Sequence, residues 1–311
     1  MISIKKTMRN TPLAWAARGG HGAVVKMLLE RDDVDLNKSG VDGRTPLFLA
    51  ACDGHEEIVK LFLRRDDINP DKPDDNGRTP LWQAASSGHE RVVKLLLGRD
   101  DVNPDKPDRF GYTPLSGVVM EGHEEILKLF LMRDDVNPDK PDEDGRTPFG
   151  WAAAMGHEQV VKLLLRRDDV DPNRSGEIGR TPLWWAAVMG HEDVVKILLG
   201  QSNVNPDSPD AWGRTPLAEA AYIGQEGVVK LLLGRDDVNP DTLDKDRQTP
   251  LCYAALNGHE GVVRLLLERE EASPNKPNPY RQAALRCAAR NGHQGVVALL
   301  QPPTPTAHRT T

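Results

Sequence analysis

The stretch Gly179-Arg-Thr-Pro-Leu-Trp-Trp-Ala-Ala-Val-Met-Gly-His191 is one copy of a unit that recurs through the whole chain. The first Thr-Pro pair begins at Thr11, and the next begins 34 residues later, at Thr45. The same step gives Thr-Pro pairs at residues 11, 45, 79, 113, 147, 181, 215 and 249, and a degraded copy without Thr-Pro at residue 283. Fixed self-similarity at such a period predicts a stacked solenoid rather than a globular enzyme.

Each copy predicts two short helices. In the quoted copy, Thr181 is a suitable N-cap, and Pro182 suits the first helical position because its missing N–H costs nothing there. Gly190 ends this first helix, since glycine adopts the left-handed conformation most easily. A second apolar run, 194–199, predicts a second helix with a broad apolar face, and a Pro- and Asp-rich segment, 203–213, leads to the next copy.

This unit resembles the ankyrin repeat, whose pattern is Gly-x-Thr-Pro-Leu-x-x-Ala-Ala-x-x-Gly-His-x-x-x-Val-x-x-Leu-Leu. The resemblance covers about residues 9–300, where eight copies keep Thr-Pro and eight keep Gly-His. It implies a curved stack with the first helices on the inner, concave side and long fingers projecting between repeats. The family usually binds other proteins. The sequence of the fingers, Arg-Asp-Asp-Val-Asn-Pro-Asp, is similar to that of ankyrin arrays of filamentous fungi.

We therefore expect an all-α repeat solenoid, a curved stack of nine helix-turn-helix repeats joined by long fingers. Residues 1–300 are expected to form the ankyrin repeat domain, and 301–311 a disordered Pro/Thr-rich tail. Prolines such as Pro104 and Pro107 cannot donate to a strand ladder, which predicts little β-structure in the fingers. Arg-Asp follows the second helix, and the sequence alone does not show how that helix end is capped. The first copy is either an N-terminal cap or the start of a piece of a longer protein.

Composition limits the classes of partner and the compartment. The net charge of -7 over 311 residues argues against nucleic acid or an anionic membrane as the main partner. No apolar run reaches the roughly 18 residues of a membrane span, and the basic residues 1–10 lack the apolar core of a secretory signal. Cys52, Cys252 and Cys287 lie in different copies, so a reducing compartment is expected. We predict a cytoplasmic protein, with the nucleus as the other compartment, that is not secreted.

The recurrent polar residues are weighed as possible chemistry. Eight histidines share one register, but consecutive copies lie about 8–10 Å apart, whereas zinc needs each nitrogen about 2.0–2.1 Å away. We therefore interpret these histidines as residues that help to start the second helix. Asp pairs such as Asp100-Asp101 lack the spacing, Gly and Glu of a calcium loop and are interpreted as solvated loops. We expect no catalytic residue, no cofactor, no metal and no small-molecule substrate.

The outward side of the first helices carries the main candidate binding site. It is mixed and mostly polar in copies one to three and in copy nine, but apolar and aromatic in copies four to eight. An exposed apolar stripe of this extent indicates an interaction surface, and Met and Trp supply adaptable contacts. The alternative is that Trp151 and Trp185 are partly buried between repeats. The candidate residues are Met120, Trp151, Met155, Trp185, Val188, Met189, Tyr222, Ile223, Tyr253 and Leu256.

The fingertips are a second candidate surface. Phe110, Tyr112 and Trp212 are aromatic where most copies have polar residues. Loops held by a rigid scaffold often carry binding residues, although these three side chains could instead pack against a neighbouring finger.

These observations predict a non-enzymatic scaffold or adaptor for protein–protein interaction. Its partner protein, of unknown identity, would bind the concave first-helix face of copies four to eight and the fingertips. The alternative is a sensor or targeting fragment of a larger signalling receptor or enzyme.

Overall fold

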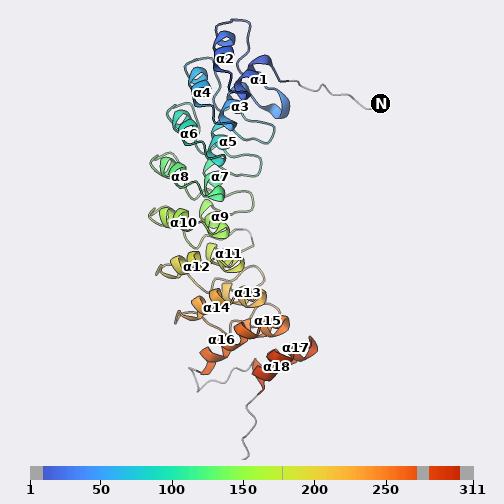
Figure 1. Ribbon diagram of the computed structural model, residues 1–311. Coiled ribbons are helices and arrows are strands. Elements are labelled where there is room, and N and C mark those ends of the chain that lie inside the picture. The colour runs from blue at the N-terminus through green and yellow to red at the C-terminus, as the bar shows by residue number, and fades with distance from the viewer. Residues whose placement is uncertain (1–9, 177, 272–279, 302–311) are drawn as a thin grey trace, which may run out of the picture. The chain divides into compact units, whose positions relative to one another are not determined.

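The computed structural model describes residues 10–176, 178–271 and 280–301 (Figure 1). Throughout these ranges the chain forms pairs of short α-helices and one 3-10 turn, Val41–Gly43, and it contains no β-strand. The predicted all-α repeat solenoid is thereby confirmed. The predicted disordered tail lies outside the described residues from residue 302 onward, and the domain boundary at residue 300 stays a prediction.

The described residues divide into two compact units. Residues 10–152 and 159–170 belong to the first unit, and residues 153–158 and 171–301 belong to the second. Helices α9 (Pro148–Met155) and α10 (Glu158–Leu164) contribute residues to both. Each unit is described separately below.

In the first unit, each helix packs on the corresponding helix of the next repeat. The first helices form one row, in which α1, α3, α5 and α7 contact one another in order, and α2, α4, α6 and α8 form a second row. The helices are α1 (Pro12–Arg18), α2 (Gly22–Leu29), α3 (Pro46–Cys52), α4 (Glu56–Leu63), α5 (Pro80–Ser86), α6 (Glu90–Leu97), α7 (Pro114–Glu121) and α8 (Glu124–Leu131).

The second unit repeats this arrangement with α11, α13, α15 and α17 in one row and α12, α14, α16 and α18 in the other. In the ninth repeat, the first helix is α17. It begins at Arg281 without a side-chain cap, because this copy has lost Thr-Pro. The helices are α11 (Pro182–Met189), α12 (Glu192–Leu199), α13 (Pro216–Ile223), α14 (Glu226–Leu233), α15 (Pro250–Asn257), α16 (Glu260–Glu271), α17 (Arg281–Arg290) and α18 (Gln294–Leu300).

The quoted stretch folds as its residue types predict. The hydroxyl of Thr181 accepts the N–H of Trp184 at 3.2 Å, and Gly190 ends α11 in the left-handed region with φ 75°. Ala186 and Ala187 are fully buried, so neighbouring first helices approach closely. Because each repeat buries its apolar side chains against the next, stability comes mainly from interfaces between neighbours.

The recurrent histidines join neighbouring repeats. His89 Nε2 lies 2.8 Å from the carbonyl oxygen of Cys52 at the end of the preceding first helix. A carbonyl can only accept, so Nε2 carries the proton. The same bond is made by His55, His123, His191, His259 and His293, and Gln225 replaces it with an amide bond to Val188. In α4, α6, α8, α12 and α18 the histidine is the N-cap residue, but its side chain makes no capping hydrogen bond and joins the preceding repeat instead.

The Arg-Asp pairs explain how the second helices end. Arg99 donates from Nη1 to the carbonyl oxygen of Leu63 at 2.6 Å, and both other guanidinium nitrogens bind Asp101. The cap of α4 therefore comes from the following repeat. Four further arginines do the same for the preceding repeat: Arg65, Arg133, Arg167 and Arg235.

The fingers are joined by single backbone hydrogen bonds rather than by sheets. Arg109 N donates to Asn76 O at 2.9 Å, and Lys245 N donates to Trp212 O at 3.0 Å. At the finger base, Asn103 N donates to the Asp71 carboxylate at 2.8 Å. This agrees with the prediction of little β-structure in the Pro-rich fingers.

Candidate protein-binding site

The second unit exposes an apolar patch on the last turns of its first helices. Met155, Met189, Tyr222, Ile223 and Leu256 have exposed fractions of 44%, 49%, 41%, 40% and 36%. They follow one another from repeat to repeat in a row of helices that are in contact, α11, α13 and α15, with Met155 held close by the bond between His191 and Ala154. We call these five residues the exposed patch.

The other predicted residues of the second unit are partly covered. Trp185, Val188 and Tyr253 are half-buried. Tyr253 packs edge-on against Tyr222, with ring centroids 5.5 Å apart, and its hydroxyl donates to the Asp244 carboxylate. Trp185 packs edge-on against the buried Trp184 at 5.1 Å. The alternative of partial burial thus holds for Trp185, while the row of patch residues beyond it stays open to solvent.

In the first unit, the predicted residues are less exposed. Met120 and Trp151 are half-buried, and Trp151 Nε1 donates to the Asp142 carboxylate at 2.9 Å. Tyr112 packs edge-on against Trp151 at 5.9 Å, and burial raises the pKa of its hydroxyl. Phe110 is exposed beside Arg109, whose guanidinium carbon lies 4.7 Å from the ring centroid. Tyr112 therefore packs on a first helix rather than on a neighbouring finger, and Phe110 is exposed at the fingertip.

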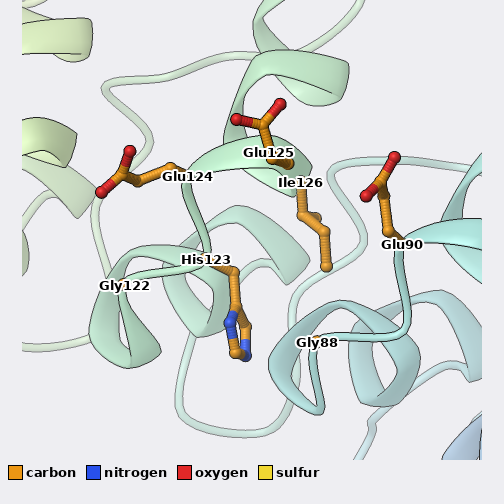
Figure 2. Close-up of a pocket in the computed structure, with 7 residues that line it drawn as sticks. All are labelled: Gly88, Glu90, Gly122, His123, Glu124, Glu125 and Ile126. Carbon is orange, nitrogen blue, oxygen red and sulfur yellow. The ribbon is translucent and has the colours of Figure 1, made fainter.

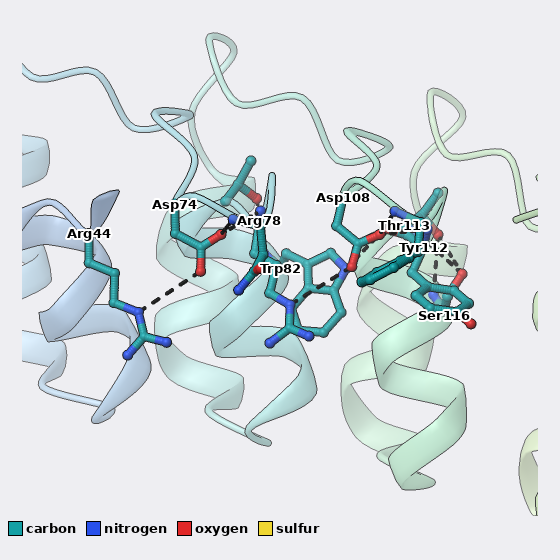
Figure 3. A network of polar contacts seen from close by, with 11 residues as sticks. Arg44, Asp74, Arg78, Trp82, Asp108, Tyr112, Thr113 and Ser116 are labelled. Carbon is teal, nitrogen blue, oxygen red and sulfur yellow. Dashed lines mark hydrogen bonds and ion pairs between the residues drawn. The ribbon is translucent and has the colours of Figure 1, made fainter. Parts of the chain in front are cut away.

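Fingertip arginines and aspartates form a row of ion pairs in the first unit (Figure 3). Arg44 Nε lies 3.9 Å from Asp74, and Arg78 Nε lies 3.8 Å from Asp108. Arg78 also stacks on Trp82, with 4.4 Å between its Cζ and the ring centroid. Each of these aspartates also accepts backbone N–H groups that close its own fingertip. The pairs fix the fingertips relative to the first helices.

The equivalent fingertips of the second unit are organised differently. Trp212 is exposed, and the guanidinium carbons of Arg180 and Arg214 lie 5.4 Å and 5.3 Å from its ring centroid. Arg214 contacts two buried carboxylates, Asp210 at 3.4 Å and Glu219 at 2.8 Å. Burial raises the pKa of Glu219. Sequence reasoning selected Trp212 but missed the charged residues, because arginine at this position recurs in most copies.

A shallow hollow in the first unit is lined by acidic residues and a histidine (Figure 2). His123 is bound to the carbonyl oxygen of Ser86, Glu90 pairs with Lys94, and Glu125 pairs with Lys128. These residues thus serve the repeat junction and the helix surface. Among the described residues, no group of three His, Cys, Asp or Glu side chains is arranged to hold a metal ion.

The first repeat leaves apolar side chains uncovered. Val24 is 41% exposed, whereas Ile58, its equivalent in the next repeat, is 3% exposed. Trp15 and Met27 are also exposed.

Comparison with known families agrees with the geometry. A family model described as ankyrin repeats (3 copies) matches residues 13–108, 99–176, 169–242 and 236–308. The chain belongs to the ankyrin repeat family. Ankyrin repeats are generally modules for protein–protein interaction and are typically non-catalytic. No curated protein matched the sequence. Within the described part of the chain, no helix combines the length and hydrophobicity needed to cross a membrane.

Proposed function

We propose that this protein is a non-enzymatic scaffold or adaptor that binds a segment of a partner protein on the first-helix face of its second unit. The observation that carries this proposal is the exposed patch, in which five large apolar side chains from successive repeats lie open to solvent. Contiguous apolar surface of this kind is characteristic of interaction sites. The fingertip residues Phe110 and Trp212 offer additional exposed aromatic contacts.

Residue types in the patch suit a protein partner. Methionine is flexible and polarisable, and tyrosine provides a rigid aromatic contact with a polar end, so both are effective at protein interfaces. The net charge of -7 disfavours nucleic acid and anionic lipid. We accordingly propose a protein partner, in the cytoplasm or nucleus, and no small-molecule substrate.

A pull-down from native lysate tests the proposal. The baits are the wild type, the double variant Met155→Glu/Met189→Glu, and the control Met132→Glu, in which an 80% exposed methionine outside the patch is changed. Circular dichroism and thermal unfolding establish that all three baits fold. Crosslinking at residue 189 then shows whether the captured protein touches the patch.

The expected result is a protein that the wild type and the Met132 variant capture and the double variant loses. Equal capture by all three baits would exclude the patch as the binding surface.

A second proposal is that the array is the sensor or targeting part of a larger receptor or enzyme. The exposed Val24 favours it, because Ile58, the equivalent residue of the next repeat, is buried and its helix packs on the preceding second helix. Transcript mapping upstream of the first codon tests it. An in-frame exon that encodes a catalytic or receptor domain would support this second function, and a stop codon in frame would remove it.

A further inference from the structure

We propose that Arg180 is a receptor for a carboxylate, and that the partner segment bound by the exposed patch carries an aspartate or glutamate side chain at the point that meets Arg180. This inference rests on the proposed function and adds a chemical requirement for the partner. It follows from three observations: the pairing of the equivalent arginines, the surroundings of Arg180, and its position beside the patch.

Arg180 occupies a position that is arginine in five repeats, and four of the five arginines pair with a carboxylate. Arg44 and Arg78 pair with the aspartate of the following finger, at 3.9 Å and 3.8 Å (Figure 3). Arg146 and Arg214 pair with the aspartate of their own finger, at 3.5 Å and 3.4 Å. Among the described residues, no carboxylate oxygen lies within 4.0 Å of a nitrogen of Arg180.

One sequence difference and one competing ion pair explain this missing pair. The aspartate of its own finger is replaced by Gly176, so the partner used by Arg146 does not exist here. The aspartate of the following finger is Asp210, which is already bound by Arg214. Glu219, a second nearby carboxylate among the described residues, also pairs with Arg214, at 2.8 Å. Both acidic groups of the cluster are therefore held by the same arginine.

The walls around Arg180 are aromatic. Its Cζ lies 4.1 Å from the ring centroid of Trp184, 5.1 Å from that of Trp185 and 5.4 Å from that of Trp212. Its Nε is buried without a hydrogen-bond partner, as in the four equivalent arginines. Burial lowers the pKa of its guanidinium, while the charges of Asp210 and Glu219 raise it. Indole rings stabilise a cation through their faces but accept no N–H as a carboxylate does. The planar guanidinium is thus held against the indole rings, and no carboxylate of the described residues binds it.

The position of Arg180 connects it to the exposed patch. It stacks on Trp185, and Met189 follows Trp185 by four residues on the same face of α11. A segment that covers Met189 and Ile223 can therefore extend past Trp185 to Arg180. A carboxylate there would accept two parallel N–H bonds from the guanidinium fork, in a site partly shielded from water.

Selection of displayed peptides tests this inference. Random 12-residue peptides on phage are selected against the whole chain as wild type, Arg180→Gln, Arg180→Lys and Met189→Glu. The matched control is Arg78→Gln. Arg78 occupies the equivalent position but already pairs with Asp108. For the best wild-type peptide, calorimetry then compares the acidic form with its Glu→Gln or Asp→Asn form.

The expected result is that wild type and the Arg78 variant enrich an acidic residue at one fixed place among apolar residues, and Arg180→Gln does not. Neutralising that acid should weaken binding to wild type about ten-fold and leave binding to Arg180→Gln unchanged. Arg180→Lys should give an intermediate effect, because it keeps the charge and loses the planar fork.

Two other outcomes would overturn the inference, and they differ in what they say of the proposed function. If Met189→Glu abolishes binding but wild type and Arg180→Gln select the same peptides, the patch binds proteins and Arg180 has no carboxylate-binding role. If no selected peptide is lost with Met189→Glu, both the inference and the proposed function fail. Thermal unfolding of each variant shows that lost binding does not reflect a lost fold.

Discussion

Arg99 caps α4 from the following repeat, with its Nη1 2.6 Å from the carbonyl oxygen of Leu63. The same guanidinium is fixed by Asp101 through two hydrogen bonds of 2.7 Å, and the pairing raises the pKa of the arginine and lowers that of the aspartate. One side chain thus satisfies a helix end and joins two repeats.

Replacing Arg99 by Gln should lower the free energy of unfolding by about 1.5–2 kcal/mol, because a charge-assisted bond to a helix carbonyl is lost. Urea unfolding followed by circular dichroism measures the change. The matched control is Arg31→Gln: Arg31 pairs with Asp33 in the same way, but in the described structure it donates to no carbonyl of a preceding repeat. An equal loss in both variants would show that the ion pair, rather than the cap, provides the stability.

His89→Ala should lower the free energy of unfolding by about 1 kcal/mol, because the carbonyl of Cys52 loses its 2.8 Å hydrogen-bond partner at a repeat junction. His89→Gln should cost less, since Gln225 makes the equivalent bond at 3.4 Å. Chemical denaturation compares both variants with His21→Ala. In the described structure His21 makes no side-chain hydrogen bond, so that control should be nearly neutral. A large loss for His21→Ala would contradict this explanation.

At the finger bases, asparagine should stabilise the fold more than aspartate does. In the copies with Asn37 and Asn173, the side-chain amide donates to the backbone carbonyl of residue 67 or 203, at 2.7 Å and 2.6 Å. In Asp71 and Asp105 the corresponding oxygen is buried and unpartnered, and burial raises the pKa of both carboxyls. Asp71→Asn should therefore stabilise the fold by about 1 kcal/mol at pH 7.

The advantage of Asp71→Asn should depend on pH. The folded chain binds a proton at Asp71 more tightly than the unfolded chain, in which the carboxyl keeps its ordinary pKa of 3.8. Wild-type stability therefore rises as the pH falls through the raised pKa toward 3.8, and the variant lacks this gain. The difference should be full at pH 7 and should disappear below about pH 4. Asn37→Asp should show the opposite sign, and a pH-independent difference would refute the argument.

Arg247→Gly, in the finger that leads to Thr249, should raise the free energy of unfolding by about 1 kcal/mol. Arg247 has φ 59°, in the region that is unfavourable for residues with a Cβ, whereas the same position is Gly213 in the preceding repeat, with φ 85°. Differential scanning calorimetry measures the shift in melting temperature. Gly213→Arg, the reverse change, serves as the control and should lower it. A destabilised Arg247→Gly would mean that the arginine makes a compensating contact.

The sequence predicted the fold well because the features that form it are local. Thr181, Pro182 and Gly190 act within a few residues, so the start and end of α11 could be read from the chain. The Pro-rich fingers lacked strands for an equally local reason. The capping of the second helices was not predictable, because Arg99 reaches a carbonyl 36 residues earlier. Gly98, which directly follows the helix, keeps a right-handed conformation and gives no signal of a left-handed cap.

The candidate site was predicted in part. The angle between residues on a helix identified Met155, Met189 and Ile223 as outward, and all three are exposed. Helical periodicity could not decide how far Trp185 is covered, since that depends on the neighbouring Trp184 and Arg180. Arg180 itself was overlooked, because its distinctive feature is the lack of a carboxylate four residues before it. The substitution by Gly176 was the available signal.

The histidine bonds at the repeat junctions and the arginine caps of the second helices end on main-chain carbonyls, as His89 does on Cys52 and Arg99 on Leu63. A carbonyl is present whatever side chain its residue carries, so a repeat makes few demands on the identity of the one before it. Unequal recombination that adds, deletes or reorders whole repeats would therefore leave these junctions intact. The gene can change the length of the array, and the residues displayed on its first helices, without having to evolve new connections between the parts.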